Sequence, residues 1–125
     1  MKPNILFITI DSFHAEKFHG DKKTSVTPNL DLIIKEGSYF SNSITCAPST
    51  LPSVGSIFTS KYPFESTIRN NENFIFNSQI PNYVNELKIN GYTTYAFIPK
   101  ILDHYGFSNL FDETKTFEHN RSLYD

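Results

Sequence analysis

The stretch NILFITID, residues 4–11, decides the fold class of this chain. Residues 5–10 are all apolar or β-branched, and the polar residues Asn4 and Asp11 bound them. A short continuous run of this kind is typical of a strand that is buried on both faces of a sheet. We therefore predict a central strand over residues 4–10, with Asp11 at its carboxyl end.

Helical and strand patterns alternate after this run. Thr27 and Pro28 are suited to the N-cap and the first position of a helix, apolar side chains follow at helical spacing, and Gly37 provides a stop. The other expected elements are a strand over 38–45, a helix from Pro52 to about Ser60, a helix over 80–90 and a strand over 92–98. Residues 64–79 are expected to form an irregular connection, and residues 101–125 show no clear period.

This alternation favours a layered α/β fold with a mostly parallel sheet. In open sheets of this kind, ligands bind beyond the carboxyl ends of the strands, which is where we expect Asp11. The length of 125 residues suits one globular domain.

Composition and charge exclude several classes of protein. An apolar content of 38% and an aromatic content of 15% are enough for a core and argue against disorder. The net charge of −2 and the lack of a long Lys/Arg run give no support for nucleic-acid or membrane partners. Cys46 has no second cysteine to pair with, and the first apolar run is too short for a membrane span and lacks a cleavage site. We therefore expect a cytoplasmic protein.

Asp11 is the first candidate site residue. A carboxylate at the end of a buried strand is well placed to hold a hard divalent cation, because such cations prefer oxygen ligands. The alternative is that Asp11 only caps a turn, a position that aspartate often fills.

The loop CAPSTLPS, residues 46–53, is the second candidate site. It places hydroxyl groups directly before an expected helix, and helix N-termini bind phosphate or sulfate readily. A hydroxyl held there beside a metal can become an attacking alkoxide. The alternative is that Ser49 or Thr50 is simply an N-cap.

Several motifs, taken in order, resemble the N-terminal part of the sulfatase family, in the alkaline phosphatase superfamily. The matching segments are Pro3 to Ser12, Thr27 to Asp31, Glu36-Gly37, Thr50 to Ser53 with Ile57, Thr59 and Tyr62-Pro63, Asn90 to Thr94, Gly106-Phe107 and Phe111-Asp112. The resemblance implies a three-layer α/β/α fold with a mostly parallel sheet. It also implies a metal-dependent hydrolase of small-molecule or glycan esters of sulfuric or phosphoric acid.

The family signature fits two registers, one starting at Cys46 and one at Thr50. Only the second continues correctly, with Ile57, Thr59 and Pro63 on later signature positions. The resemblance therefore implies that Thr50 is the nucleophile, and Cys46 is expected to be a small buried residue. By the same resemblance, Asp11 and Thr50 are ligands of a divalent metal (Ca, Mg, Mn or Zn), and Lys100 is a weaker candidate for substrate binding.

Threonine at the nucleophile position departs from sulfatases proper, which convert a Cys or Ser there to formylglycine. The residue resembles instead the phosphodiesterase and phosphoglycerol-transferase branches, in which an unmodified Thr attacks phosphorus. These branches are the alternative interpretation of the function.

The family's catalytic domain is several times longer than this chain, and its remaining metal ligands come far downstream. Residues 1–125 are therefore expected to be a partial sulfatase-like domain with little activity alone, and a missing C-terminal half is an expected partner. A truncated remnant that binds anions without turnover is a further alternative.

Overall fold

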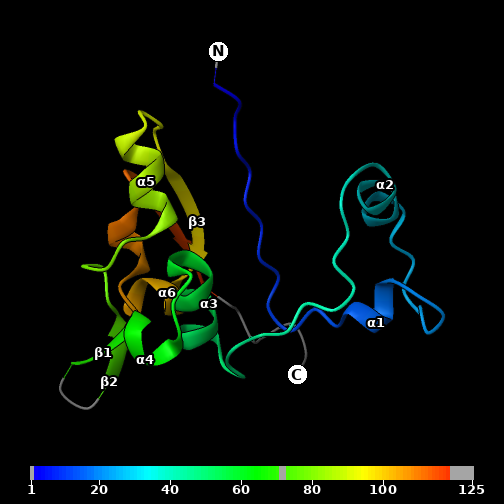
Figure 1. Cartoon of the computed structure of the whole chain (residues 1–125), viewed down its shortest axis with the longest axis horizontal. Coiled ribbons are helices and arrows are strands. Elements are labelled where there is room, and N and C mark those ends of the chain that lie inside the picture. Colours follow the sequence, from blue (N-terminus) through cyan, green and yellow to red (C-terminus); the bar gives the residue numbers. More distant parts are fainter. Residues whose placement is uncertain (1, 71–72, 119–125) are drawn as a thin grey trace. The chain divides into compact units, whose positions relative to one another are not determined.

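The computed structural model describes residues 2–70 and 73–118, which belong to two compact units (Figure 1). The first unit ends at Ile44, and the second begins at Thr45. None of the helices in the described residues is both long and apolar enough to span a membrane.

The first unit contains two helices, α1 (Ala15–Phe18) and α2 (Pro28–Glu36). Helix α2 begins and ends where the sequence predicts, because proline suits the first turn and the chain turns away at Gly37. The Gly37 amide donates a hydrogen bond to the carbonyl of Ile33 at 2.8 Å, which closes the last turn.

Residues 4–10 form no strand in the described structure, which corrects the prediction of a buried central strand. Their apolar side chains are exposed, from 51% for Phe7 to 85% for Leu6. A strand forms only where another strand satisfies its main-chain groups, and no described strand pairs with this segment. The strand expected over residues 38–45 is absent for the same reason.

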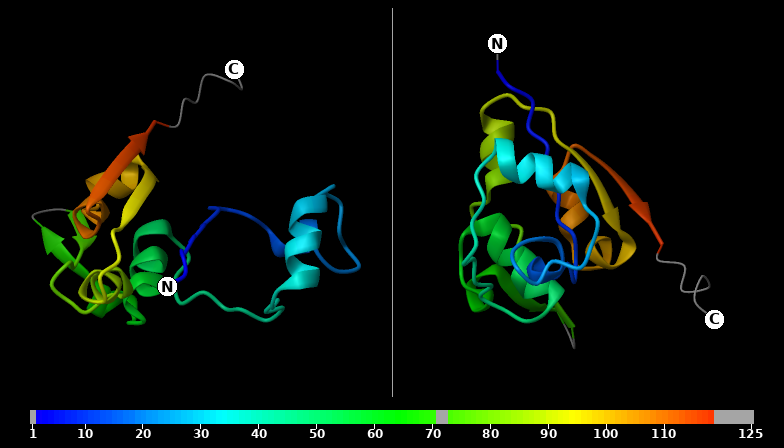
Figure 2. Two further views of the ribbon diagram at one scale, coloured as in Figure 1. Left: turned by 90° about the horizontal axis from the view of Figure 1, so that it is seen from above. Right: turned by 90° about the vertical axis from the view of Figure 1, so that its right-hand side faces the viewer.

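The second unit contains all the strands of the described residues (Figure 2). Its elements are α3 (Thr50–Thr59), α4 (Pro63–Ser66), β1 (Thr67–Asn70), β2 (Asn73–Phe76), α5 (Tyr83–Ile89), β3 (Tyr95–Pro99), α6 (Lys100–His104), the 3-10 helix η1 (Phe107–Leu110) and β4 (Glu113–Phe117). The predicted helix over 80–90 and strand over 92–98 are confirmed as α5 and β3, with later starts.

The segment 64–79, predicted to be irregular, forms α4 and the antiparallel pair β1–β2. Ile68 pairs with Ile75 in this hairpin. Strands this short are marginal alone, and here β2 is held because Phe76 is buried in the core. The Asn-rich composition of this segment therefore did not predict the two short strands, because packing against the core stabilises them.

Strands β3 and β4 form a parallel pair, with Tyr95 opposite Glu113 and Pro99 opposite Phe117. Parallel neighbours need a long crossover connection, which α6 and η1 supply. An α/β arrangement is thus present. The mostly parallel three-layer sandwich stays a prediction, since the described strands form two-stranded sheets.

The core of the second unit is built around Phe107, which is 1% exposed. Its ring lies 4.6 Å from that of Phe76 and 5.6 Å from that of Phe58, between ring centroids. The other buried apolar residues are Leu51, Val84, Leu102 and Leu110. Helices α3, α5 and α6, η1 and strand β2 therefore meet at one aromatic centre.

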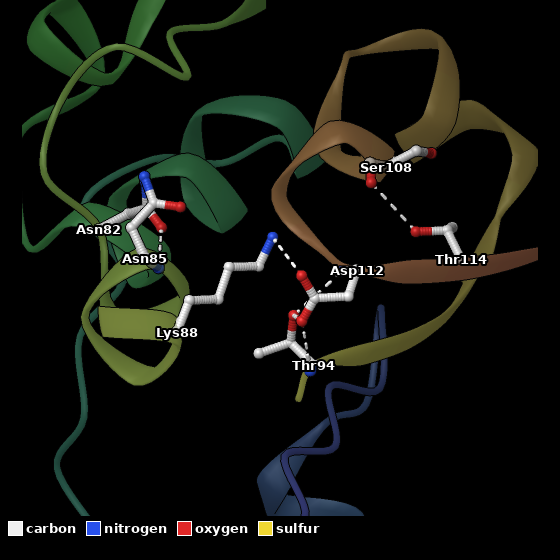
Figure 3. Close-up of polar contacts among 7 residues, drawn as sticks. All are labelled: Asn82, Asn85, Lys88, Thr94, Ser108, Asp112 and Thr114. Atoms are coloured by element: carbon white, nitrogen blue, oxygen red, sulfur yellow. Dashed lines mark hydrogen bonds and ion pairs between the residues drawn. The ribbon is translucent and has the colours of Figure 1, made fainter. Parts of the chain in front are cut away.

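Asp112 joins the starts of β3 and β4 (Figure 3). Its Oδ2 accepts hydrogen bonds from the amide of Thr94 at 2.8 Å and from the Thr94 hydroxyl at 2.9 Å, and Lys88 Nζ lies 3.2 Å from Oδ1. The Thr94 amide, then its hydroxyl and then Lys88 stabilise the carboxylate and lower the pKa of Asp112.

We expect Asp112→Asn to lower the midpoint temperature of unfolding by a few degrees at neutral pH. As the pH is lowered, the midpoint temperature of this variant should fall less than that of the parent. The folded pKa of Asp112 lies below the ordinary value of 3.8. The carboxylate therefore stabilises the fold above that value, and this contribution is lost as the pH falls through the folded pKa. Circular dichroism melts from neutral pH into acid measure the effect. Glu113→Gln, which removes the same charge from the neighbouring exposed residue, is the control, and an equal change in both variants would contradict this role for Asp112.

Candidate active site

Thr50 is the first residue of α3, two positions before the helix start expected at Pro52. Ser49 is the N-cap, but its side chain makes no capping hydrogen bond, so the helix is not held by a serine cap. Pro52 lies in the first turn, where its missing N–H costs nothing. Thr50 therefore stands at the positive end of a helix dipole, where negative charge is stabilised.

The loop before α3 is ordered by Thr45. Its hydroxyl donates to the carbonyl of Ala47 at 2.9 Å and lies 3.1 Å from the hydroxyl of Ser53, in the first turn of the helix. Cys46 is exposed, which corrects the expectation of a buried residue. Residues 45–46 and 48–49 of this loop are all exposed and only Ala47 is half-buried, so the loop has little cover at this position.

An open hollow of about 640 Å³ lies beside Thr50. Its walls come from the start of α3, from α4, from the β1–β2 hairpin and from the end of α6. The lining includes Thr50, Phe64, Thr67, Phe74, His104 and Tyr105. The volume suits a small organic ligand.

Main-chain hydrogen bonds hold these walls together. The Phe76 amide donates to the carbonyl of Tyr105 at 2.9 Å, which ties the end of α6 to β2. The Asn77 amide donates to the carbonyl of Ser66 at 2.9 Å, which ties the end of β2 to α4. Ser66 is fully buried against Gly55, where an added Cβ would lie 3.0 Å from its Oγ. The absence of a side chain at Gly55 therefore lets α3 approach α4 closely.

Asp11 lies in the first unit, in a turn after residues 4–10, and is exposed. Thr50 lies in the second unit, so the structure describes the two predicted metal ligands separately. Both offer oxygen donors, which suits a hard cation. Within residues 2–70 and 73–118, however, no three His, Cys, Asp or Glu side chains gather into a metal site. Two oxygen donors are too few to complete the coordination of such a cation.

Lys100, the candidate for substrate binding, is the first residue of α6 and lies directly after β3. Its Nζ lies 2.6 Å from Oε1 of Glu118, and this hydrogen bond and charge raise the pKa of Lys100. It is not among the residues that line the hollow beside Thr50. The structure thus brings Thr50 together with His104, not with Lys100.

Sequence reasoning missed the aromatic walls of the hollow. Phe64 and Phe74 fall within the segment taken as irregular, and His104 and Tyr105 fall in the tail without a clear period. The short apolar run Phe74-Ile75-Phe76, bounded by Asn73 and Asn77, was the available signal for β2. Nothing in the spacing of His104 pointed to Thr50, because their proximity depends on how α6 packs on the hairpin.

Comparison with known proteins places this sequence in a family. The sequence model of the family described as Sulfatase matches residues 3–125. An ulvan-active sulfatase from Formosa agariphila is 38% identical over 64 residues, covering 50% of this chain and 12% of that protein. An arylsulfatase from Clostridium perfringens is 38% identical over 60 residues, covering 47% of this chain and 12% of that protein. No solved structure gives a significant match.

Two general properties follow from the family. Sulfatases have an α/β fold of the alkaline phosphatase type and generally use a divalent metal. The matched region spans only 12% of the length of each of these curated relatives. Because the family match covers residues 3–125, nearly the whole sequence, this chain belongs to the sulfatase family.

Proposed function

We propose that this chain is the N-terminal part of the catalytic domain of a hydrolase for sulfuric or phosphoric esters, with Thr50 as its nucleophile. One observation carries the proposal. Thr50 is the first residue of α3 and also lines the open hollow, so a hydroxyl, a helix N-terminus and space for a ligand coincide. The names of the relatives support sulfate esters as one substrate class.

The reaction proceeds in two steps. The Thr50 oxygen attacks sulfur or phosphorus, the bond to the alcohol oxygen breaks, and the alcohol leaves with a proton. Water then hydrolyses the threonine ester, which releases sulfate or phosphate and restores the hydroxyl. Main-chain N–H groups at the start of α3 stabilise the negative charge on the transferred group.

A phosphodiesterase or phosphotransferase of the same superfamily is the second candidate. The observation that favours it is the threonine itself, because a threonine is not the Cys or Ser that sulfatases convert to formylglycine. In this variant the first step is the same, and a second alcohol can replace water in the second step.

A substrate panel with trapping of the intermediate tests the proposal. The longest polypeptide that the reading frame encodes is incubated with 4-nitrophenyl sulfate, phosphate and a phosphodiester, then quenched in acid. We expect turnover of at least one ester and a phosphoryl or sulfuryl group on the peptide that contains Thr50, detected by mass spectrometry. Turnover with the group on another residue would exclude Thr50 as the nucleophile.

We also propose that Asp11 is one ligand of a divalent metal, with further ligands outside the described residues. A divalent cation at such a site would supply Lewis-acid stabilisation of the ester oxygens. Asp11→Asn is then expected to raise the metal concentration for half-maximal activity by about tenfold or more, since even indirect partners of a metal change affinity that much.

Metal titration after chelation measures this change. The control is Asp21→Asn, an exposed aspartate in the same unit. If both variants titrate as the parent does, Asp11 is not a ligand.

A further inference from the structure

Strand β4 has one edge paired with β3 and a second, outer edge that no other described strand uses. The two strands run side by side (Figure 2), and within residues 2–70 and 73–118 they make a sheet of their own. Two short strands alone make a marginal sheet, and further strands add stability. The outer edge of β4 is therefore a place where another strand would stabilise the second unit.

The main-chain groups of Thr114 and Thr116 point toward this outer edge. The Glu113 amide donates to the carbonyl of Thr94 at 3.2 Å, so the main chain of Glu113 pairs toward β3. Successive residues of a strand direct their N–H and C=O groups to opposite sides, and Thr114 and Thr116 therefore direct theirs away from β3. Such a row of donors and acceptors is a template for a strand of another chain.

The composition of β4 permits pairing at this edge. Its sequence is ETKTF, residues 113–117, without the proline or glycine that interrupts a strand, and threonine and phenylalanine favour strands. Lys115 protects the edge, because a charged side chain there disfavours pairing with a strand that offers no opposite charge. A partner with a carboxylate opposite Lys115 removes that protection.

Glu113 and Lys115 make β4 complementary to a second copy of itself. When two β4 strands pair antiparallel around a two-fold axis at Thr114, Glu113 of each copy lies opposite Lys115 of the other. Thr114 then pairs with Thr114 of the second copy through main-chain hydrogen bonds. The charged pairs fall at the positions between, where side chains lie closer and opposite charges are stabilising. Both charged side chains are exposed, and neither has a salt bridge within the described residues.

Other registers of the same pairing are less favourable. An axis at Glu113 or at Lys115 would place like charges opposite each other, which is destabilising. An axis at Thr116 would place Lys115 opposite Phe117 and leave the lysine without a carboxylate. The order of charges in β4 therefore selects the axis at Thr114.

We propose that the outer edge of β4 binds a second copy of this chain, in a dimer with a two-fold axis at Thr114 and a continuous sheet in the order β3-β4-β4-β3. The proposal is independent of the proposed function, because none of residues 113–117 lines the hollow beside Thr50. An interface of two short strands is small, so the dimer is weak, with a Kd on the order of 10⁻⁴ M. Salt weakens it further, since exposed charge pairs are screened.

Sedimentation equilibrium of the 125-residue chain tests the proposal. Between about 10 μM and 1 mM, which brackets the expected Kd, the mass should rise from that of a monomer toward that of a dimer. Amide hydrogen exchange at Thr114 should slow as the dimer forms. Exchange at Phe97 should not change, because this residue is three positions after Thr94 and directs its amide away from β4. A chain that stays monomeric, or protection at Phe97 instead of Thr114, would overturn the proposal.

Charge reversals make the test specific to the register. Glu113→Lys or Lys115→Glu alone places like charges opposite each other at both symmetry-related positions, so each should weaken association at least about tenfold. An equimolar mixture of these two variants restores opposite charges at both positions and should associate about as well as the parent. Glu86→Lys, the same charge change on an exposed residue of α5, is the control and should associate as the parent does.

Two outcomes with the variants contradict the proposal. One is equal association of the parent and the two single variants. The other is loss of association in both variants without recovery when they are mixed, since the proposed register requires recovery. Circular dichroism checks that each variant is folded, and both substitutions are at exposed positions. The exchange measurement at Thr114 uses the parent chain and so tests the edge whatever the stability of the variants.

Discussion

Thr50→Ala is expected to lower kcat by at least about a thousandfold, the loss that follows removal of an enzyme's nucleophile. The substitution removes the only side chain that forms a bond to sulfur or phosphorus in the proposed mechanism. Alanine suits a helix start sterically, so the fold of α3 should remain. Initial rates with the best ester of the panel, in the longest encoded polypeptide, measure the effect.

Two variants control this experiment. Thr50→Ser keeps a hydroxyl at the same atom position and should retain a substantial part of the activity. Thr116→Ala removes an exposed threonine from β4 in the same unit and should leave the rate unchanged. If Thr50→Ala turns over ester at a rate within a few-fold of the parent, Thr50 is not the nucleophile.

Phe107→Ala is expected to destabilise the second unit by about 3–5 kcal/mol, the usual cost of truncating a buried phenylalanine. Phe107 is 1% exposed, and its ring contacts those of Phe58 and Phe76. A small domain has a total stability of only about 5–15 kcal/mol, so this variant should be largely or entirely unfolded near physiological temperature. Urea unfolding followed by circular dichroism measures the change.

Phe97→Ala provides the matched control, because the same side chain is removed from a position that is 71% exposed. Its ring contacts that of Phe117 at 4.8 Å, so a loss of about 1 kcal/mol or less is expected. Equal destabilisation by the two substitutions would mean that the aromatic centre at Phe107 is not the core of this unit.

Local signals predicted helices better than strands. Helix α2 was predicted from Thr27, Pro28 and Gly37, because capping and proline chemistry depend on neighbours in the sequence. Helix α5 ends close to the predicted residue for the same kind of reason, although it starts later, after the cap that Asn82 provides to the Asn85 amide at 3.0 Å. Such features need no distant partner.

Strands were harder to predict, because a local sequence pattern does not identify the strand with which a segment pairs. The run at residues 4–10 has the composition of a buried strand, but no described strand pairs with it. Strand β4 lies in a tail without periodicity and exists because β3 offers it a parallel edge and Asp112 joins the two. Pairing energy comes from residues far away in the chain, so a local pattern cannot decide it.

The sequence by itself determined the family and the helices that local chemistry begins and ends, and it predicts the place of Thr50 in the family signature. Only the tertiary structure decided what surrounds Thr50. Phe64, Phe74 and His104 line the same hollow because α4 and the β1–β2 hairpin pack against α3, where Gly55 admits close approach, and because a main-chain hydrogen bond ties the end of α6 to β2. A motif records the order of residues along the chain, whereas a binding surface is made by residues that packing brings together from separate segments.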